Sequence, residues 1–241
     1  MASHRTYDPG RGSRLRGAIL VLAAALLSAA PAAAGMPAAC RIPDAFLDTP
    51  SLDRTESGIL GRREVRIVIM GPMLGRMIGT QTPLEQALES RLPGINFEVT
   101  QAMSLGLAED DFAGLRLLLH GRAAPDLVIW QVGVRDAMAA SDVEDFEQTL
   151  DAAHGWLDAR GADLLLVDPP FVEGVSHERI YTPYIGGIGE VSREEGVPML
   201  RRYAAMRYLE GEADRRRLKS EILRPCVSEL MAEAIVRAVG K

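Results

Sequence analysis

Histidine and cysteine are both scarce in this chain of 241 residues, which contains four histidines and two cysteines. These residues are scattered along the sequence, whereas protein zinc sites are built from His and Cys residues at short, regular spacings. The glycine-rich stretch GGIGEV at 186–191 lacks the last glycine of a dinucleotide-binding fingerprint and does not directly follow a strand pattern. The sequence therefore predicts neither a metal centre nor a cofactor.

Long hydrophobic runs are also lacking after the N-terminus. The single such run, at 18–30, follows three arginines, is too short to span a bilayer comfortably, and precedes the small residues Ala32–Ala34. We expect residues 1–34 to be a cleaved secretory signal, with an uncleaved membrane anchor as the alternative. No second run follows, so we expect a periplasmic or secreted bacterial protein with no membrane span after signal removal.

The chain has fewer basic than acidic residues, 27 against 33. The net charge is −6, and removing residues 1–34, which carry four arginines and one aspartate, makes it −9. Nucleic-acid binding depends on neutralising phosphates, so this balance argues against a nucleic-acid partner.

The two cysteines, Cys40 and Cys226, lie near opposite ends of the mature chain. In an oxidising compartment an isolated pair favours one disulfide, which would close nearly the whole domain into a loop. Two free thiols are the alternative.

Strand and helix patterns alternate from residue 63 onward. Apolar runs predict strands at 65–70, 95–101, 125–133, 162–170 and 197–200. Helical spacing predicts helices at 83–92, 107–121, 141–161, 180–195 and from about 225, the third opened by a capping box of Ser141 and Glu144. Apolar strands separated by helices indicate a parallel sheet covered on both faces. We expect one α/β domain at 63–241, preceded by an extended N-terminal segment at 35–62.

In such sheets the functional site lies outside the carboxyl ends of the strands. The segments expected at that edge are 71–79, 104–111, 133–138, 168–173 and 201–224, the last expected to be a loop.

Six segments resemble the SGNH/GDSL hydrolases in order and spacing: VRIVIMG (65–71), QAMSLGLAED (101–110), PDLVIWQVGVRDAM (125–138), GADLLLVDPPF (161–171), EEGVPMLRRYAAMR (194–207) and PCVSELMAEAI (225–235). The likeness is to exported bacterial members and covers roughly residues 40–240. It implies a flavodoxin-like, three-layer α/β/α fold with a five-stranded parallel sheet. It also implies an ancestry among enzymes that hydrolyse or transfer acyl esters.

The family's catalytic positions hold residues that cannot perform its chemistry. The family uses a serine nucleophile, a histidine base with an aspartate three residues before it, and an oxyanion hole made by a glycine N–H and an asparagine. The positions of the serine, asparagine, histidine and aspartate fall on Met73, Arg135, Leu218 and Arg215. Asp214 lies one residue from the aspartate position. The oxyanion-type glycine matches at Gly106.

Other polar residues at this edge could perform the catalytic roles instead. Ser104 lies in the correct loop, but a serine needs a base within hydrogen-bond reach and more simply caps the next helix. Asp168 ends a strand as part of an Asp-Pro turn, and His177 follows it. His120 and His154 fall on helices away from the edge, and Glu109–Asp111 favours a helix N-terminus.

Positive charge collects at the same edge. Arg76 and Arg135 belong to two of its loops, and Arg215, Arg216, Arg217 and Lys219 belong to a third. They could hold a carboxylate, uronate or phosphate, or they could pair with Asp136, Asp168, Asp214 and Glu221. The candidate ligand-binding residues are Arg135, Arg76, Ser104 and Asp168.

The sequence thus predicts an exported SGNH/GDSL-hydrolase-like protein that is not catalytic. It would bind an anionic small molecule or glycan, or a partner protein in the envelope. The alternatives are an esterase or acyltransferase with a non-standard site around Ser104, Asp168 or His177, and a structural envelope protein with an empty cleft.

Overall fold

The structure, a computed structural model, describes residues 1, 35–47, 50–71, 82–102, 106–171, 178–216, 223 and 225–240. In these ranges five parallel strands form one sheet in the order β2-β1-β3-β4-β5. The strands are β1 (Glu64–Met70), β2 (Asn96–Ala102), β3 (Leu127–Gln131), β4 (Asp163–Val167) and β5 (Met199–Leu200). This order is the flavodoxin-like one, which confirms the predicted fold class.

The central strands are buried on both faces because their apolar residues are continuous rather than alternating. In β3, Leu127 and Ile129 face one hydrophobic core, and Val128 and Trp130 face the other. Successive side chains of a strand point to opposite faces, so a strand can fill two cores in this way.

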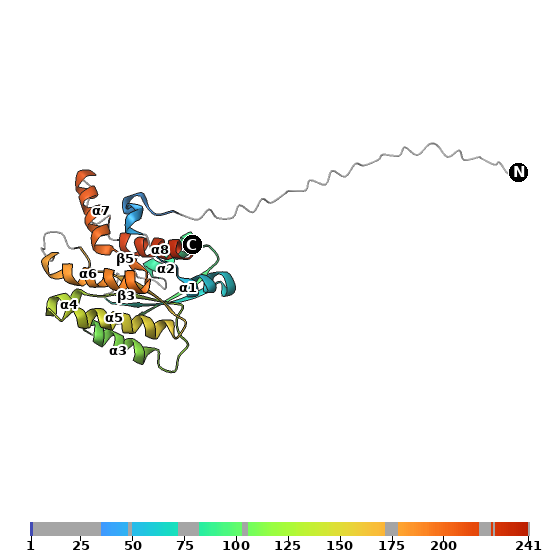
Figure 1. Cartoon of the computed structure of the whole chain (residues 1–241). Coiled ribbons are helices and arrows are strands. Elements are labelled where there is room, and N and C mark those ends of the chain that lie inside the picture. The colour runs from blue at the N-terminus through green and yellow to red at the C-terminus, as the bar shows by residue number, and fades with distance from the viewer. Residues whose placement is uncertain are drawn as a thin grey trace. The chain divides into compact units, whose positions relative to one another are not determined.

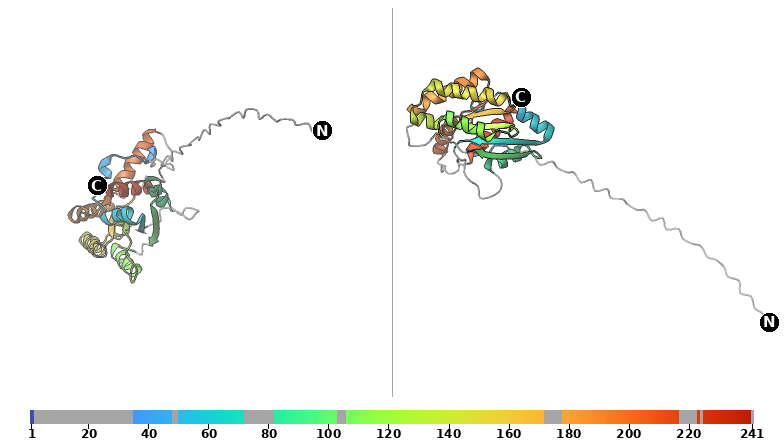
Figure 2. Two further views of the ribbon diagram at one scale, coloured as in Figure 1. Left: turned by 90° about the vertical axis from the view of Figure 1, so that its right-hand side faces the viewer. Right: turned by 90° about the horizontal axis from the view of Figure 1, so that it is seen from below.

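Helices cover both faces of the sheet (Figure 1). One core contains residues of α2 (Pro83–Arg91), α7 (Arg202–Arg216) and α8 (Cys226–Ala238). The other contains residues of α3 (Ala108–Leu118), α4 (Val134–Ala139), α5 (Val143–Asp158) and α6 (Glu178–Glu195). Figure 2 shows α3, α5 and α6 as a row along one face. No helix in the described ranges has the length and apolar character needed to cross a membrane.

The segment 35–62 is not extended throughout, which corrects the prediction. It contains two short turns, η1 (Ala38–Cys40) and η2 (Asp44–Phe46), then α1 (Asp53–Ser57) and the single π-helical turn η3 (Gly58–Arg62). Leu47 and Leu52 insert into the core shared by α2 and α8. The carboxylate of Asp163 at the start of β4 accepts bonds from the backbone N and Oγ1 of Thr55, at 2.8 and 2.7 Å, and so holds the first turn of α1.

The predicted disulfide is confirmed. Cys40 in η1 is bonded to Cys226, the first residue of α8, with their Cα atoms 5.1 Å apart. The bond fastens the N-terminal segment to the last helix, and both cysteines are buried in the same core.

Two local predictions are wrong. Residues 202–216 form helix α7 rather than a loop. The cap of α5 is Asp142, whose carboxylate accepts from the N–H groups of Glu144 and Asp145, rather than Ser141. The stretch 186–191 lies inside α6, as the predicted helix at 180–195 implies.

Candidate functional site

The carboxyl edge of the sheet is formed by the ends of β1, β3 and β4 together with the start of α3. Gly71, directly after β1, has φ +115°, and a Cβ atom there would lie 2.7 Å from Cβ of Gln131. Eight residues that the sequence assigns to this edge lie outside the described residues: Met73, Arg76, Ser104, His177, Arg217, Leu218, Lys219 and Glu221. The described part of the edge contains Gly106, Arg135 and Asp168.

The N–H of Gly106 is already engaged by a carboxylate of this chain. Gly106 N donates to Asp111 Oδ1 at 3.3 Å, and Leu107 N donates to Asp110 Oδ2 at 3.1 Å. The next residue, Ala108, donates its N–H to Asp136 Oδ1 at 3.0 Å. Three successive N–H groups at the start of α3 are thus each paired with a different aspartate, which satisfies the donors that a helix N-terminus otherwise leaves free.

Asp136 is the least expected member of this group, because it comes from α4. It is buried, and burial raises its pKa, with the nearby charge of Asp111 adding to the rise and the Ala108 N–H opposing it. In the sequence, pairing of Asp136 with an arginine of the edge was one of two alternatives. Asp136 instead fixes the start of α3 against α4.

Arg135 precedes Asp136 on α4 and is exposed. Neighbouring residues of a helix point in different directions, so Asp136 faces inward while Arg135 faces solvent. Arg135 forms no ion pair with any described residue. The family resemblance implies a neutral amide at this position, where this chain has an exposed arginine.

Asp168 lies directly beyond β4 and is 1% exposed. Its Oδ1 accepts from the N–H of Tyr203 at 2.8 Å, so it caps the start of α7. Burial raises the pKa of Asp168 to about 7, although the Tyr203 N–H and the charge of Arg202 lower it. A buried carboxyl that holds a helix in this way is not placed to act on a ligand at the surface.

Arg202 was missed from the sequence. It is 3% exposed, its Nε donates to the carbonyl oxygen of Asp168 at 3.0 Å, and its Nη1 donates to Oε1 of Gln131 at 2.7 Å. Its Nη2 has no hydrogen-bond partner among the described residues. Burial lowers the pKa of Arg202 to about 10. Its position two residues after β5 could have pointed to it, but Arg201, which directly follows the strand, carries the same charge and is exposed.

The raised pKa of Asp168 predicts a specific pH dependence of stability. Its pKa is about 7 in the folded protein against an ordinary value of 3.8, so the folded state binds this proton more tightly. The resulting stabilisation is complete below about pH 4 and is lost as the pH rises through 7. Between about pH 5.5 and pH 8.5 the free energy of unfolding should fall by about 2 kcal/mol more in the wild type than in Asp168→Asn. The asparagine oxygen keeps the bond from Tyr203. Denaturant titrations at the two pH values test this, and parallel profiles would contradict it.

Arg215 and Arg216 are part of α7 and not of a loop. Both contact the carboxylate of Glu212 one turn earlier, and both are exposed. Asp214 is exposed on the same helix. Arg215 and Arg216 thus pair with Glu212 rather than with Asp214, and exposed pairs of this kind contribute little to stability. Glu221, another acidic residue that could pair with them, lies outside the described residues.

The histidines and acidic groups show no metal site in the described ranges, where no group of three or more His, Cys, Asp or Glu could hold an ion. His120 follows the C-terminal end of α3, and His154 lies within α5, so both are on the helical layer as expected.

Solved structures of other proteins share the fold of this chain. The five-stranded parallel sheet matches solved SGNH/GDSL hydrolases. LAE5, an α/β hydrolase enzyme from the metagenome of Lake Arreo in Spain, is 20% identical with TM-score 0.56, over 73% of this chain and 95% of its own. Axe2, an acetylxylan esterase from Geobacillus stearothermophilus, is 16% identical with TM-score 0.55, and the match covers 73% of this chain and 94% of Axe2. EstA, a psychrotrophic esterase from Pseudoalteromonas sp., is 16% identical with TM-score 0.55, and the match covers 73% of this chain and 99% of EstA.

No curated protein matches the chain. The sequence profile of the non-GDSL lipase-like family matches residues 39–241 and so includes most of the N-terminal segment before residue 63. With that match over most of its length, the chain belongs to the non-GDSL lipase-like family.

Proposed function

We propose that this chain is an exported SGNH/GDSL-hydrolase-like protein that does not turn over acyl esters. It binds an anionic small molecule or glycan, or a partner protein of the envelope, on the scaffold that its relatives use for hydrolysis. Axe2 has been solved as catalytic mutants at a serine, an aspartate and a histidine. By the family resemblance the corresponding positions here hold Met73, Arg215 and Leu218.

The observation that carries the proposal is the pairing of the Gly106 N–H with the carboxylate of Asp111. In acyl transfer, such a donor must be free to stabilise the oxyanion, and losing one donor costs about 3–4 kcal/mol of transition-state stabilisation. Here the donor faces a negative group instead. An oxyanion about 4 Å from a carboxylate is opposed by roughly 4 kcal/mol at an effective dielectric of 20.

The described residues supply no base for a nucleophile at this edge. A serine or similar nucleophile needs a histidine or carboxylate within hydrogen-bond reach. Asp168 is buried beneath α7 and accepts from the N–H of Tyr203, and Asp136 accepts from the N–H of Ala108. Arg135, exposed at the same edge and unpaired within the described ranges, supports a role in holding an anion rather than in chemistry.

Export is supported by two independent features. The N-terminal 34 residues have the charge, apolar run and small residues of a secretory signal. Cys40 and Cys226 are joined in a disulfide, which persists in oxidising compartments.

The second candidate is an esterase or acyltransferase that works through Ser104, Asp168 or His177. The pKa of Asp168, about 7, favours it, since a general base works best with a pKa near the operating pH. The burial of Asp168 opposes it.

One assay separates the two candidates. The purified protein is incubated with p-nitrophenyl acetate and butyrate and with a fluorophosphonate probe, with EstA, which has been solved inhibited by monoethylphosphonate, as the positive control. We expect no ester turnover above buffer and no labelling. Ser104→Ala is the matched control. Turnover together with labelling that disappears in Ser104→Ala would reject the non-catalytic function.

A further inference from the structure

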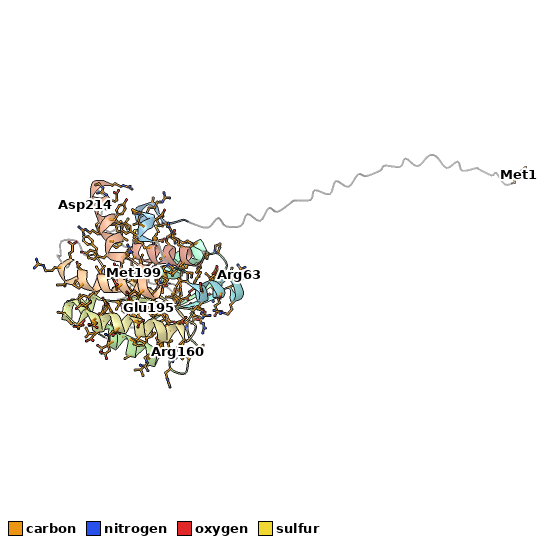
Figure 3. All side chains as sticks on the ribbon, viewed as in Figure 1. Met1, Arg63, Arg160, Glu195, Met199 and Asp214 are labelled. Atoms are coloured by element: carbon orange, nitrogen blue, oxygen red, sulfur yellow. A yellow bond between two sulfur atoms is a disulfide. The ribbon has the colours of Figure 1, made fainter. Side chains whose placement is uncertain are left out.

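A groove of about 600 Å³ lies between the C-terminal ends of α3 and α5. Its walls include Arg116, Leu117, His120 and Arg122 from α3 and the turn after it, and Trp156 and Arg160 from α5 and the turn after it. Because α3 leads into β3 and α5 leads into β4, these helix ends lie at the amino edge of the sheet, opposite the candidate site. Figure 3 shows Arg160 on the far side of the molecule from Asp214 of α7.

The groove concentrates positive charge in an acidic protein. Arg116, Arg122 and Arg160 form no ion pair with any described residue, and no acidic side chain is among the described residues that line the groove. Glu98 lines a smaller adjoining cavity together with Arg122, without an ion pair between the two. These arginines are therefore available to an outside anion.

Helix C-termini attract cations, so the arginines could serve only to compensate the helix ends. Each helix end carries a partial charge of about −0.5, so α3 and α5 together contribute about −1. Three guanidinium groups exceed this by about two positive charges. Of the three, Arg160 is the one that donates to a carbonyl of its own helix end, Nη1 to Trp156 O at 3.2 Å. Compensation of the helix ends therefore accounts for only part of the positive charge.

Aromatic rings hold two of these guanidinium groups in place. Cζ of Arg160 lies 3.7 Å from the ring centroid of Trp156, and Cζ of Arg116 lies 5.8 Å from that of Phe112. The two rings contact each other edge to face, with centroids 5.9 Å apart. An arginine stacked on a ring keeps the N–H groups at its edge free and loses less side-chain freedom when it binds a planar anion.

From this geometry we propose that the groove binds a multivalent organic anion, whose carboxylate or phosphate groups are held by Arg116, Arg122 and Arg160. Guanidinium groups bind both kinds of oxyanion through two parallel hydrogen bonds. The volume lies within the range of roughly 300–1,000 Å³ typical of small-molecule sites. This second site does not depend on the proposed function at the carboxyl edge.

Calorimetric titration with two probes tests the proposal and identifies the anion class. Pyrophosphate represents phosphates, and trigalacturonate represents carboxylates. We expect saturable binding of at least one probe, weakened by added salt because the contacts are ionic. Arg116→Gln and Arg160→Gln should each weaken that binding about tenfold, in line with the loss of one charged hydrogen-bonding group, and the double variant should abolish it.

Arg179→Ala is the matched control, since Arg179 is an exposed arginine at the opposite end of the fold on α6. It should bind as the wild type does. The proposal is overturned if neither probe binds, if the groove variants bind as tightly as the wild type, or if Arg179→Ala weakens binding equally. Loss of binding in Arg135→Ala alone would locate the anion at the carboxyl edge and would also reject the groove. The ester assay is unaffected by any of these results.

Discussion

Replacing both Cys40 and Cys226 with serine should lower the free energy of unfolding by about 5 kcal/mol. The bond joins residues 186 positions apart, and closing a loop of that length removes a large amount of entropy from the unfolded chain. A loss of this size is comparable to the whole stability of many domains. Urea or guanidinium denaturation of the wild type and the double variant measures it.

Buried serines also cost packing and hydrogen bonding, so a second comparison is needed. Wild-type protein with the disulfide reduced in place keeps both sulfur atoms in the core. Its transition midpoint should fall nearly as far as that of the double variant. Equal midpoints for the oxidised and reduced wild type would show that the bond does not stabilise the fold.

Gly71→Ala should destabilise the protein by about 3 kcal/mol. Gly71 has φ +115°, a conformation that an L-residue adopts only with strain, and the new Cβ would lie 2.7 Å from Cβ and 2.8 Å from the carbonyl oxygen of Gln131. Those atoms belong to the central strand β3, so neither side can move without disturbing the sheet. The cost is measured by denaturant titration.

Gly155→Ala is the control for this substitution. Gly155 lies within α5, and a Cβ there meets no atom within 4 Å. Alanine has the higher helix propensity, so the variant should gain about 0.5–1 kcal/mol. If the two variants shifted stability alike, the close approach between Gly71 and Gln131 would not be the cause.

The sheet could be predicted from the sequence because its strands are continuous apolar runs bounded by glycine and proline. Helix α7 could not be predicted in the same way. Its buried face consists of Ala205, Leu209 and Ala213, with Arg202 at its start, and the rest is rich in charge. Two small residues and one leucine give a weak periodic signal. The regular spacing of four residues was the available indication.

The N-cap of α5 could not be predicted from the sequence for a different reason. Ser141 and Asp142 are adjacent, and both residue types are strong N-caps. The structure selects Asp142, while the backbone oxygen of Ser141 accepts from the hydroxyl of Tyr184 on α6. This hydrogen bond joins two residues 43 positions apart, and such a contact cannot be seen in the local sequence pattern.

The candidate site could be predicted only in part. By the family resemblance the serine and histidine positions fall on Met73 and Leu218, and both lie outside the described residues, so the loss of these groups stays a prediction. The pairing of the Gly106, Leu107 and Ala108 N–H groups with Asp111, Asp110 and Asp136 could not be predicted from the sequence. Asp110 and Asp111 were interpreted correctly as favouring a helix N-terminus. The third partner, Asp136, comes from α4, which was not predicted as a helix.

The bond between η1 and α8 sets an order of events during biosynthesis. The last helix contributes Leu230, Met231 and Ile235 to the core that also holds Leu47 and Leu52 of the N-terminal segment. That core cannot close until α8 is free to pack against the N-terminal segment. The N-terminal segment of the domain is thus made first but is among the last parts to be packed and bonded to its partner. Until then its apolar residues have no partner from α8 and depend on protection from aggregation.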